Sequence, residues 1–155
     1  MPEKETLERA EEDKREGKSP GTQAGEFVKE EIEHIREGKH GARSTKQAIA
    51  IGLSKARRAG VKLKPPGKGK ASERTRRQAA RDVSKGSSKR KARPSSKRSR
   101  ATSSALKRES RKAASKQSLS RQARSAAARR YKAARSRSAR KAASTRRSTS
   151  SHRAA

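Results

Sequence analysis

The sequence predicts a mostly α-helical protein in which a short helical hairpin precedes a long basic tail that is disordered or only conditionally helical. Apolar residues recur at helical spacing only in the first part of the chain. Charge divides in the same way: residues 1–60 hold 13 Lys and Arg against 12 Asp and Glu, and residues 61–155 hold 33 against three, so the net charges are +1 and +30. The predicted parts are a charged lead-in (1–21), a helical hairpin (22–63), a linker (64–71) and a low-complexity basic tail (72–155).

The lead-in is expected to be solvated. Leu7 is its one large apolar side chain after Met1, so a helix there has no stripe to bury and is marginal. Gly17 and Pro20 interrupt any such helix. Over the whole chain only 26% of residues are apolar, many of them Ala. Burial of so few side chains does not offset an ordering cost of roughly 1–2 kcal/mol per residue, so we expect disorder over most of residues 64–155.

The first helix of the hairpin is predicted over residues 22–37. Thr22 is placed to cap its amino end, and Gly38 is placed to end it. The apolar stripe places residues at i, i+4 and i+7, which is one face of a helix. This stripe consists of Val28, Ile32 and Ile35, with Phe27 beside it.

The second helix is predicted over residues 44–59. Ser44 followed by Gln47 is a capping-box pattern at its amino end. Gly60 is placed to end the helix in a left-handed conformation, and Pro65 prevents its continuation. The apolar face comprises Ile49, Leu53 and Ala56, on which Val61 and Leu63 can fold back.

Two helices of this size have too small a core to be stable alone. Their apolar surface is therefore predicted to be an interface, either in a homodimer through residues 22–63 or with another partner. A second interpretation is a reader of helix-turn-helix type with Lys46, Lys55, Arg57 and Arg58 facing DNA. The predicted interface residues are Phe27, Val28, Ile32, Ile35, Ile49, Leu53 and Leu63.

The tail begins with one more predicted helix, over residues 72–84, which Ser72 can cap. Beyond residue 100 the tail is low in complexity, and the pentapeptide RKAAS occurs at Arg111–Ser115 and again at Arg140–Ser144. Ala, Arg and Lys favour helix, whereas repulsion between like charges opposes it. We expect coil in isolation and partial helix on a polyanion.

No arrangement typical of a catalytic, cofactor or metal site is evident, so the sequence predicts no enzyme. Without Cys the chain has neither disulfides nor thiolate ligands. His34 is expected to be a half-exposed helical residue, His40 to contact a carbonyl or water in a turn, and the cluster Glu30, Glu31 and Glu33 to be a solvated face. No apolar run approaches the ~18 residues of a membrane span, and no secretory signal is present, so we expect a cytoplasmic protein.

The polycationic tail favours nucleic acid as the partner. Of its 33 cations 20 are Arg, which binds phosphate oxygens in a bidentate manner. Tyr131 is the one aromatic residue of the tail, which argues against base stacking on single strands. The predicted nucleic-acid-binding residues are Arg76, Arg77, Arg81, Lys89, Arg90, Lys91, Arg93, Lys97, Arg98, Arg100, Arg111, Lys112, Arg129, Arg130, Lys132, Arg135, Arg137, Arg140, Lys141, Arg146 and Arg147.

Two resemblances agree with this interpretation. The motifs RKAAS, YKAAR and RSAR resemble the tails of linker histone H1 and of bacterial H1-like nucleoid proteins, although this tail is richer in Arg and Ser. The stretch EFVKEEIEHIREGKHGARSTKQAIAIGLSKARRAGVKL resembles a family of small basic bacterial proteins with a domain of unknown function, often labelled DNA-binding or histone-like. That resemblance implies a bacterial, nucleoid-associated protein and supplies no catalytic residues.

The function expected from the sequence is that of a histone-like protein that binds duplex DNA without sequence preference and compacts the nucleoid. Two alternatives stay open. One is an RNA- or ribosome-associated basic factor, and the other is an adaptor whose hairpin docks a protein partner.

Overall fold

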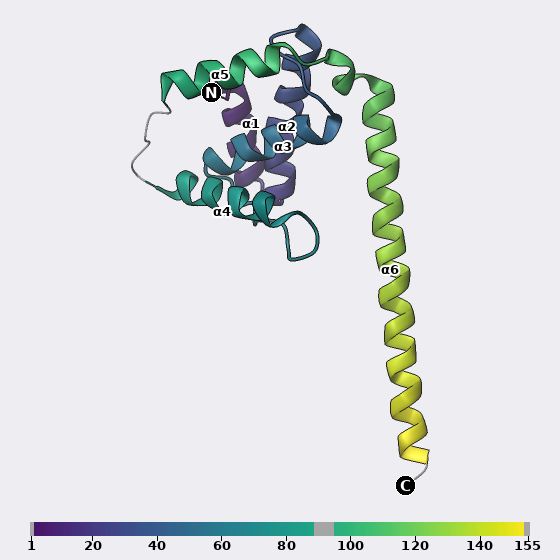
Figure 1. Cartoon of the computed structure of the whole chain (residues 1–155). Coiled ribbons are helices and arrows are strands. Elements are labelled where there is room, and N and C mark those ends of the chain that lie inside the picture. The colour runs from purple at the N-terminus through teal and green to yellow at the C-terminus, as the bar shows by residue number, and fades with distance from the viewer. Residues whose placement is uncertain (1, 89–94, 154–155) are drawn as a thin grey trace. The chain divides into compact units, whose positions relative to one another are not determined.

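The computed structural model describes residues 2–88 and 95–153, with side chains as far as Arg140. The chain divides into two compact units, residues 1–118 and 119–155. The described residues form helices α1 (Lys4–Arg15), α2 (Pro20–Glu37), α3 (Thr45–Arg58), α4 (Glu73–Ser87), α5 (Ser96–Lys107) and α6 (Lys116–Arg153), with a 3₁₀ turn, η1 (Arg111–Ala114), before α6 (Figure 1).

The expectation of a long disordered tail is wrong. Helices α4, α5 and α6 occupy most of the chain from Glu73 to Arg153. No Gly follows Gly86 and no Pro follows Pro94, and 25 of the 38 residues of α6 are Ala, Arg, Lys, Gln or Leu, which are good helix formers. Disorder was expected because residues 64–155 have too few apolar side chains to bury. A helix instead satisfies its backbone hydrogen bonds within itself, so this composition is compatible with an exposed helix.

The predicted ends of the hairpin helices are confirmed where a local cap defines them. Ser44 Oγ accepts a hydrogen bond from the backbone N–H of Gln47 at 3.2 Å, and Gly38 adopts the left-handed conformation with φ of 82°. The α2 helix begins earlier than predicted, because Ser19 rather than Thr22 caps it and Pro20 occupies its first turn.

The lead-in is a packed helix, contrary to the expectation that it is solvated. Helix α1 lies against α2 through Thr6 and Ala10, which are 0% and 6% exposed. These side chains are small, so α1 approaches α2 closely without a stripe of large apolar residues. Arg9 Nε also donates to Glu26 Oε2 at 2.8 Å, which ties the two helices together by an ion pair.

The core lies between α2 and α3, with α1 on one side. Phe27 is 1% exposed and packs with Ala10, Ala24 and Ala56, and the returning residues Val61 and Leu63 cover the cluster. The α2 and α3 backbones approach most closely at Gly52, where a Cβ atom would lie 2.7 Å from Val28 Cα. Large apolar groups are few, so the core depends on this close approach of backbones.

The predicted interface is covered within one chain. Phe27, Ile32 and Ile35 are buried, and the other four predicted residues, Val28, Ile49, Leu53 and Leu63, are partly buried. Among the described side chains the large apolar groups that stay exposed are Leu7 and Tyr131. The unit therefore supplies from α1, α4 and η1 much of the cover that the sequence argument assigned to a partner.

Helix α4 is held on α3 by a buried carboxylate. Asp82 is 1% exposed and accepts hydrogen bonds from Ser54 Oγ at 2.7 Å, Arg58 Nε at 2.8 Å and Gln78 Nε2 at 3.1 Å. Gly86 contacts the backbone carbonyl of Arg57 so closely that no side chain fits there. Ser72 caps α4 as predicted.

The first RKAAS pentapeptide is part of the packed unit. Ala113 and Ala114 of η1 are 7% and 1% exposed, and Thr45 Oγ1 donates to the Ala113 carbonyl at 2.7 Å. Arg36 Nε donates to the Ala114 carbonyl at 3.1 Å. Further along, Gly41 N–H donates to the Leu106 carbonyl at 2.9 Å. Chain segments 65 or more residues apart are thereby joined.

Candidate nucleic-acid interface

Among the described helices α6 carries the largest number of cations. This helix carries 13 Lys and Arg among its 38 residues and no Asp or Glu. Every described side chain from Ala127 to Arg140 is exposed. Successive residues of a helix are about 100° apart, so Arg129, Arg130 and Lys132 point in three directions and the charge surrounds the helix. Of the predicted residues, Arg135, Arg137 and Arg140 also lie here, as do Lys141, Arg146 and Arg147, whose side chains lie outside the described part.

Helix α4 adds a cationic stripe that the sequence argument identified only in part. Arg74, Arg77, Arg81 and Lys85 fall at i, i+3, i+7 and i+11 and are all exposed, while Ala79 and Asp82 face the core. Arg77 also pairs with Glu73 at 3.3 Å. Arg76 was predicted to bind nucleic acid but is turned toward the linker, where its Nε donates to the Pro66 carbonyl at 3.3 Å. The helical period over residues 74–85 was the sequence signal that could have distinguished the exposed cations of this stripe from Arg76.

The remaining predicted cations fall into two groups. Lys97, Arg98 and Arg100 are exposed on α5, and Arg111 and Lys112 are exposed on η1. Within the described residues α5 has no buried side chain and no carboxylate, so its cations face solvent. Lys89, Arg90, Lys91 and Arg93 lie outside the described residues.

Three of the four cations of the helix-turn-helix interpretation are engaged inside the unit. Lys55 Nζ lies 3.1 Å from Glu30 Oε1 and 2.7 Å from Glu31 Oε2. Arg58 pairs with the buried Asp82. Arg57 is 8% exposed, and its burial lowers the pKa of its guanidinium. Lys46 and Arg58 are both exposed, but the Arg58 guanidinium is paired with Asp82, so the four cations do not form one free reading face on α3.

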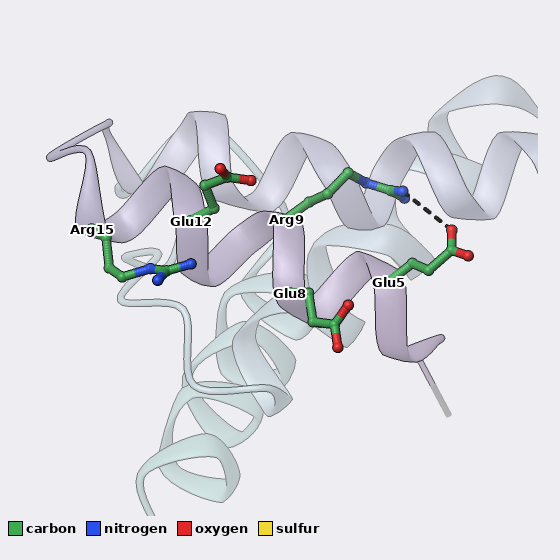
Figure 2. A pocket seen from close by; sticks show the side chains of 5 residues that line it. All are labelled: Glu5, Glu8, Arg9, Glu12 and Arg15. Carbon is green, nitrogen blue, oxygen red and sulfur yellow. Dashed lines mark ion pairs between the residues drawn. The ribbon is translucent and has the colours of Figure 1, made fainter.

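Most of the acidic residues lie near the amino end of the chain. Residues 3–37, which include α1 and α2, hold 12 Asp and Glu against seven Lys and Arg. Figure 2 shows a shallow, open depression on α1 that is lined by Glu5, Glu8, Arg9, Glu12 and Arg15. Its side chains come from a single helix, and Arg9 pairs with Glu5 at 3.5 Å. We assign the depression no ligand, because it is a solvated helix surface.

The cluster of glutamates on α2 is not the solvated face that the sequence argument predicted. Glu30 and Glu31 are 2% and 0% exposed, and only Glu33 faces solvent. Burial alone would raise the pKa of Glu30, but hydrogen bonds from Thr6, the Glu3 backbone N–H and Lys55 together lower it. The Glu30 carboxylate therefore stays charged inside the unit.

Residues 17–69 match a protein family described as "Family of unknown function (DUF6496)". The domain of unknown function expected from the sequence is thus found, over a segment that runs from the end of α1 through α2 and α3 to the linker. No curated protein and no solved structure matches the chain. Across the described residues no helix has the length and apolar character needed to cross a membrane.

Proposed function

We propose that this chain is a histone-like protein that binds duplex DNA without sequence preference by neutralising its phosphates. The observation that carries the proposal is α6, a helix of 38 residues with 13 cations and no carboxylate, in which every side chain from Ala127 to Arg140 is exposed. Each phosphate neutralised by Lys or Arg releases condensed counterions, which favours binding whatever the base sequence. Net charge supports the same partner, because the whole chain carries +31.

The helical form of α6 favours duplex DNA over duplex RNA. A helix of 38 residues is about 57 Å long, which is on the order of 17 base pairs of B-DNA. The major groove of B-DNA admits an α-helix, whereas that of A-form RNA is too deep and narrow. Cations that surround the helix suit a groove, since phosphates lie on both of its sides. Small Ala and Ser side chains between them allow the close approach of the backbone.

The proposed binding involves neither contacts to base edges nor stacking on bases. Tyr131 is the single aromatic residue of α6, and the guanidinium of Arg135 lies 5.9 Å from the centre of its ring. The exposed cations of α4 and α5 provide a separate phosphate-binding surface on the first unit. A protein of this kind would act on the bacterial nucleoid, with compaction as its expected effect.

The test uses the full chain and two sets of six substitutions to Gln, so both variants keep a net charge of +25. The first set is on α6: Arg129, Arg130, Lys132, Arg135, Arg137 and Arg140. The control set consists of exposed cations of the first unit: Lys14, Arg15, Lys29, Arg43, Lys46 and Lys62.

Affinity for a 30-base-pair duplex is measured by fluorescence anisotropy across a salt series. If α6 contacts phosphate, the plot of log K against log salt becomes shallower by about 5 for the α6 variant, because each contact contributes roughly 0.9. The control variant should change much less. Equal losses in the two variants would mean that only overall charge matters, and the role of α6 would be rejected.

The alternatives are separated by parallel titrations. Duplex RNA, single-stranded RNA and DNA of scrambled sequence are compared at one salt concentration. Tighter binding to RNA would favour an RNA- or ribosome-associated factor. Retention of a protein partner by residues 1–118 with no nucleic-acid affinity in the full chain would favour an adaptor.

A further inference from the structure

A cluster of metal-ligating side chains lies where α2 ends and the turn to α3 begins. One carboxylate oxygen of Glu31 and one ring nitrogen each of His34 and His40 lie within 4.8 Å of one another. Glu31 is fully buried, and the His34 and His40 side chains are 13% and 17% exposed. Glu31 and His34 fall at i and i+3 on α2, so they share one helix face. The turn between Gly38 and Gly41 returns His40 to that face.

Glu31 differs from its neighbour Glu30 in how its oxygens are satisfied. Glu30 accepts from the Glu3 backbone N–H and from Lys55 Nζ, both at 3.1 Å. Glu31 has two close neighbours, with Lys55 Nζ 2.7 Å from Oε2 and His40 Nε2 3.3 Å from Oε1. Neither of its oxygens takes part in a well-formed hydrogen bond, although both are buried. Oε2 is compensated by its ion pair with Lys55, whereas Oε1 is a buried carboxylate oxygen without a hydrogen bond, which is costly and favours a further ligand.

Each histidine uses one ring nitrogen in a hydrogen bond, and the other lies near a buried glutamate: His40 Nε2 is 3.3 Å from Glu31 Oε1, and His34 Nδ1 is 3.9 Å from Glu30 Oε1. His40 Nδ1 lies 3.1 Å from the Gly41 carbonyl, which can only accept, so Nδ1 carries the proton and Nε2 faces Glu31. His34 Nε2 lies 2.8 Å from Glu3 Oε1 and donates to that carboxylate, which leaves Nδ1 bare. Metal-binding histidines show this pattern, in which the second nitrogen donates to a carbonyl or a carboxylate.

We propose that Glu31, His34 and His40 bind a divalent transition-metal ion, with Zn²⁺ best suited to the site. Two imidazoles and one carboxylate form a donor set that zinc accepts, and a water would complete a tetrahedron. Lys55 stays paired with Glu30 and with Oε2 of Glu31, so Oε1 is left for the metal. Ligands about 2.0–2.1 Å from a tetrahedral ion lie roughly 3.3 Å apart, so the cluster must contract by about 1.5 Å at most. His40 lies in a turn rather than a helix and can supply this movement.

Metal binding at this site would be independent of nucleic-acid binding. The ion would join α2 to the turn before α3, and through Glu3 it would hold the start of α1. The expected role is structural, with one coordination position open to water.

The experiment uses the full chain in phosphate-free buffer without nucleic acid. Isothermal titration with Zn²⁺ should give one site per chain, and Co²⁺ should give the intense visible absorption of a tetrahedral ion. His34→Ala and His40→Ala should each weaken binding by at least 100-fold. His152→Ala removes the third histidine of the chain, which lies at the far end of the sequence, and is the matched control that should bind as the wild type does.

Two results would overturn the proposal. One is the absence of both Zn²⁺ binding and the Co²⁺ spectrum in the wild-type chain, which needs no variant and would leave His40 and Glu31 as an ion pair only. The other is equal binding in the three histidine variants. Circular dichroism of each variant in the presence of EDTA shows whether the fold survives without metal, so loss of binding is not confused with loss of structure.

Discussion

Gly52 offers the sharpest test of how the hairpin is packed. In the interior of an ordinary helix, replacing Gly by Ala stabilises by about 1 kcal/mol, because Ala loses less conformational freedom on folding. At Gly52 the new Cβ would lie 2.7 Å from Val28 Cα, 2.9 Å from the Phe27 carbonyl oxygen and 3.0 Å from Val28 Cγ2. Two of these contacts are with backbone, which cannot rotate away, so α2 and α3 must separate.

Overpacking of this kind costs up to about 3 kcal/mol, and the gain in helix propensity offsets about 1 kcal/mol of it. We therefore expect Gly52→Ala to lower the free energy of unfolding by about 2 kcal/mol. For a unit of 118 residues, that corresponds to a Tm lower by roughly 8 °C. Gly25, on α2, is the matched control, because no atom lies within 4 Å of the Cβ it would gain. Gly25→Ala should stabilise by about 0.5–1 kcal/mol.

The assay is thermal and urea denaturation of the full chain, followed by circular dichroism at 222 nm. The packed unit should give the cooperative transition, whereas α6 has no packing partner within its own unit and should contribute a gradual slope. If Gly52→Ala stabilises the chain as much as Gly25→Ala does, the α2 and α3 backbones do not approach each other as closely at Gly52 as described.

Three further predictions concern α4, η1 and α6. Asp82→Ala should lower the free energy of unfolding in urea by about 2–4 kcal/mol, because it removes the shared acceptor of three hydrogen bonds. The control Glu73→Ala, on the exposed face of α4, should change it by less than about 0.5 kcal/mol. Equal effects of the two variants would contradict the anchoring role of Asp82. Thr45→Val removes the buried hydrogen bond to the Ala113 carbonyl of η1. The nearby hydrogen bond from the Gly41 amide to the Leu106 carbonyl should then open more often, so hydrogen exchange at Gly41 should accelerate. Unchanged exchange would mean that η1 is held by other contacts. Ala133→Pro should lower both helicity and DNA affinity at constant charge, while Ala133→Ser should not; full affinity in the kinked variant would show that a continuous helix is unnecessary.

What could be predicted from the sequence is mostly local. Ser44, Gly38 and Ser72 specify helix ends through bonds that reach only a few residues, so the caps and the two amphipathic helices could be recognised. The packing of α1 was missed because Thr6 and Ala10 make its contacts, and neither residue type signals burial. The tail was misjudged because helix formation was tied to apolar burial.

The features of the sites depend on contacts that are distant in sequence. Asp82 was counted as one of three tail carboxylates, and nothing local shows that it reaches Arg58 and Ser54. Glu31 and His34 have helical spacing, but the ligand set is complete only once the turn returns His40 to the same face. The cationic stripe of α4 could have been found, since its helical period is present in the sequence.

The docking of η1 also has a consequence for the order of folding. The contact from Gly41 to Leu106 closes a loop of 65 residues, whereas the ion pair between Arg9 and Glu26 closes one of 17. By the logarithmic rule for loop closure, these cost about 3.7 and 2.5 kcal/mol respectively. The turn should therefore dock after the helices of the hairpin have met. A variant such as Thr45→Val should then leave the refolding rate almost unchanged and speed unfolding, which stopped-flow measurements with both limbs of the chevron would show.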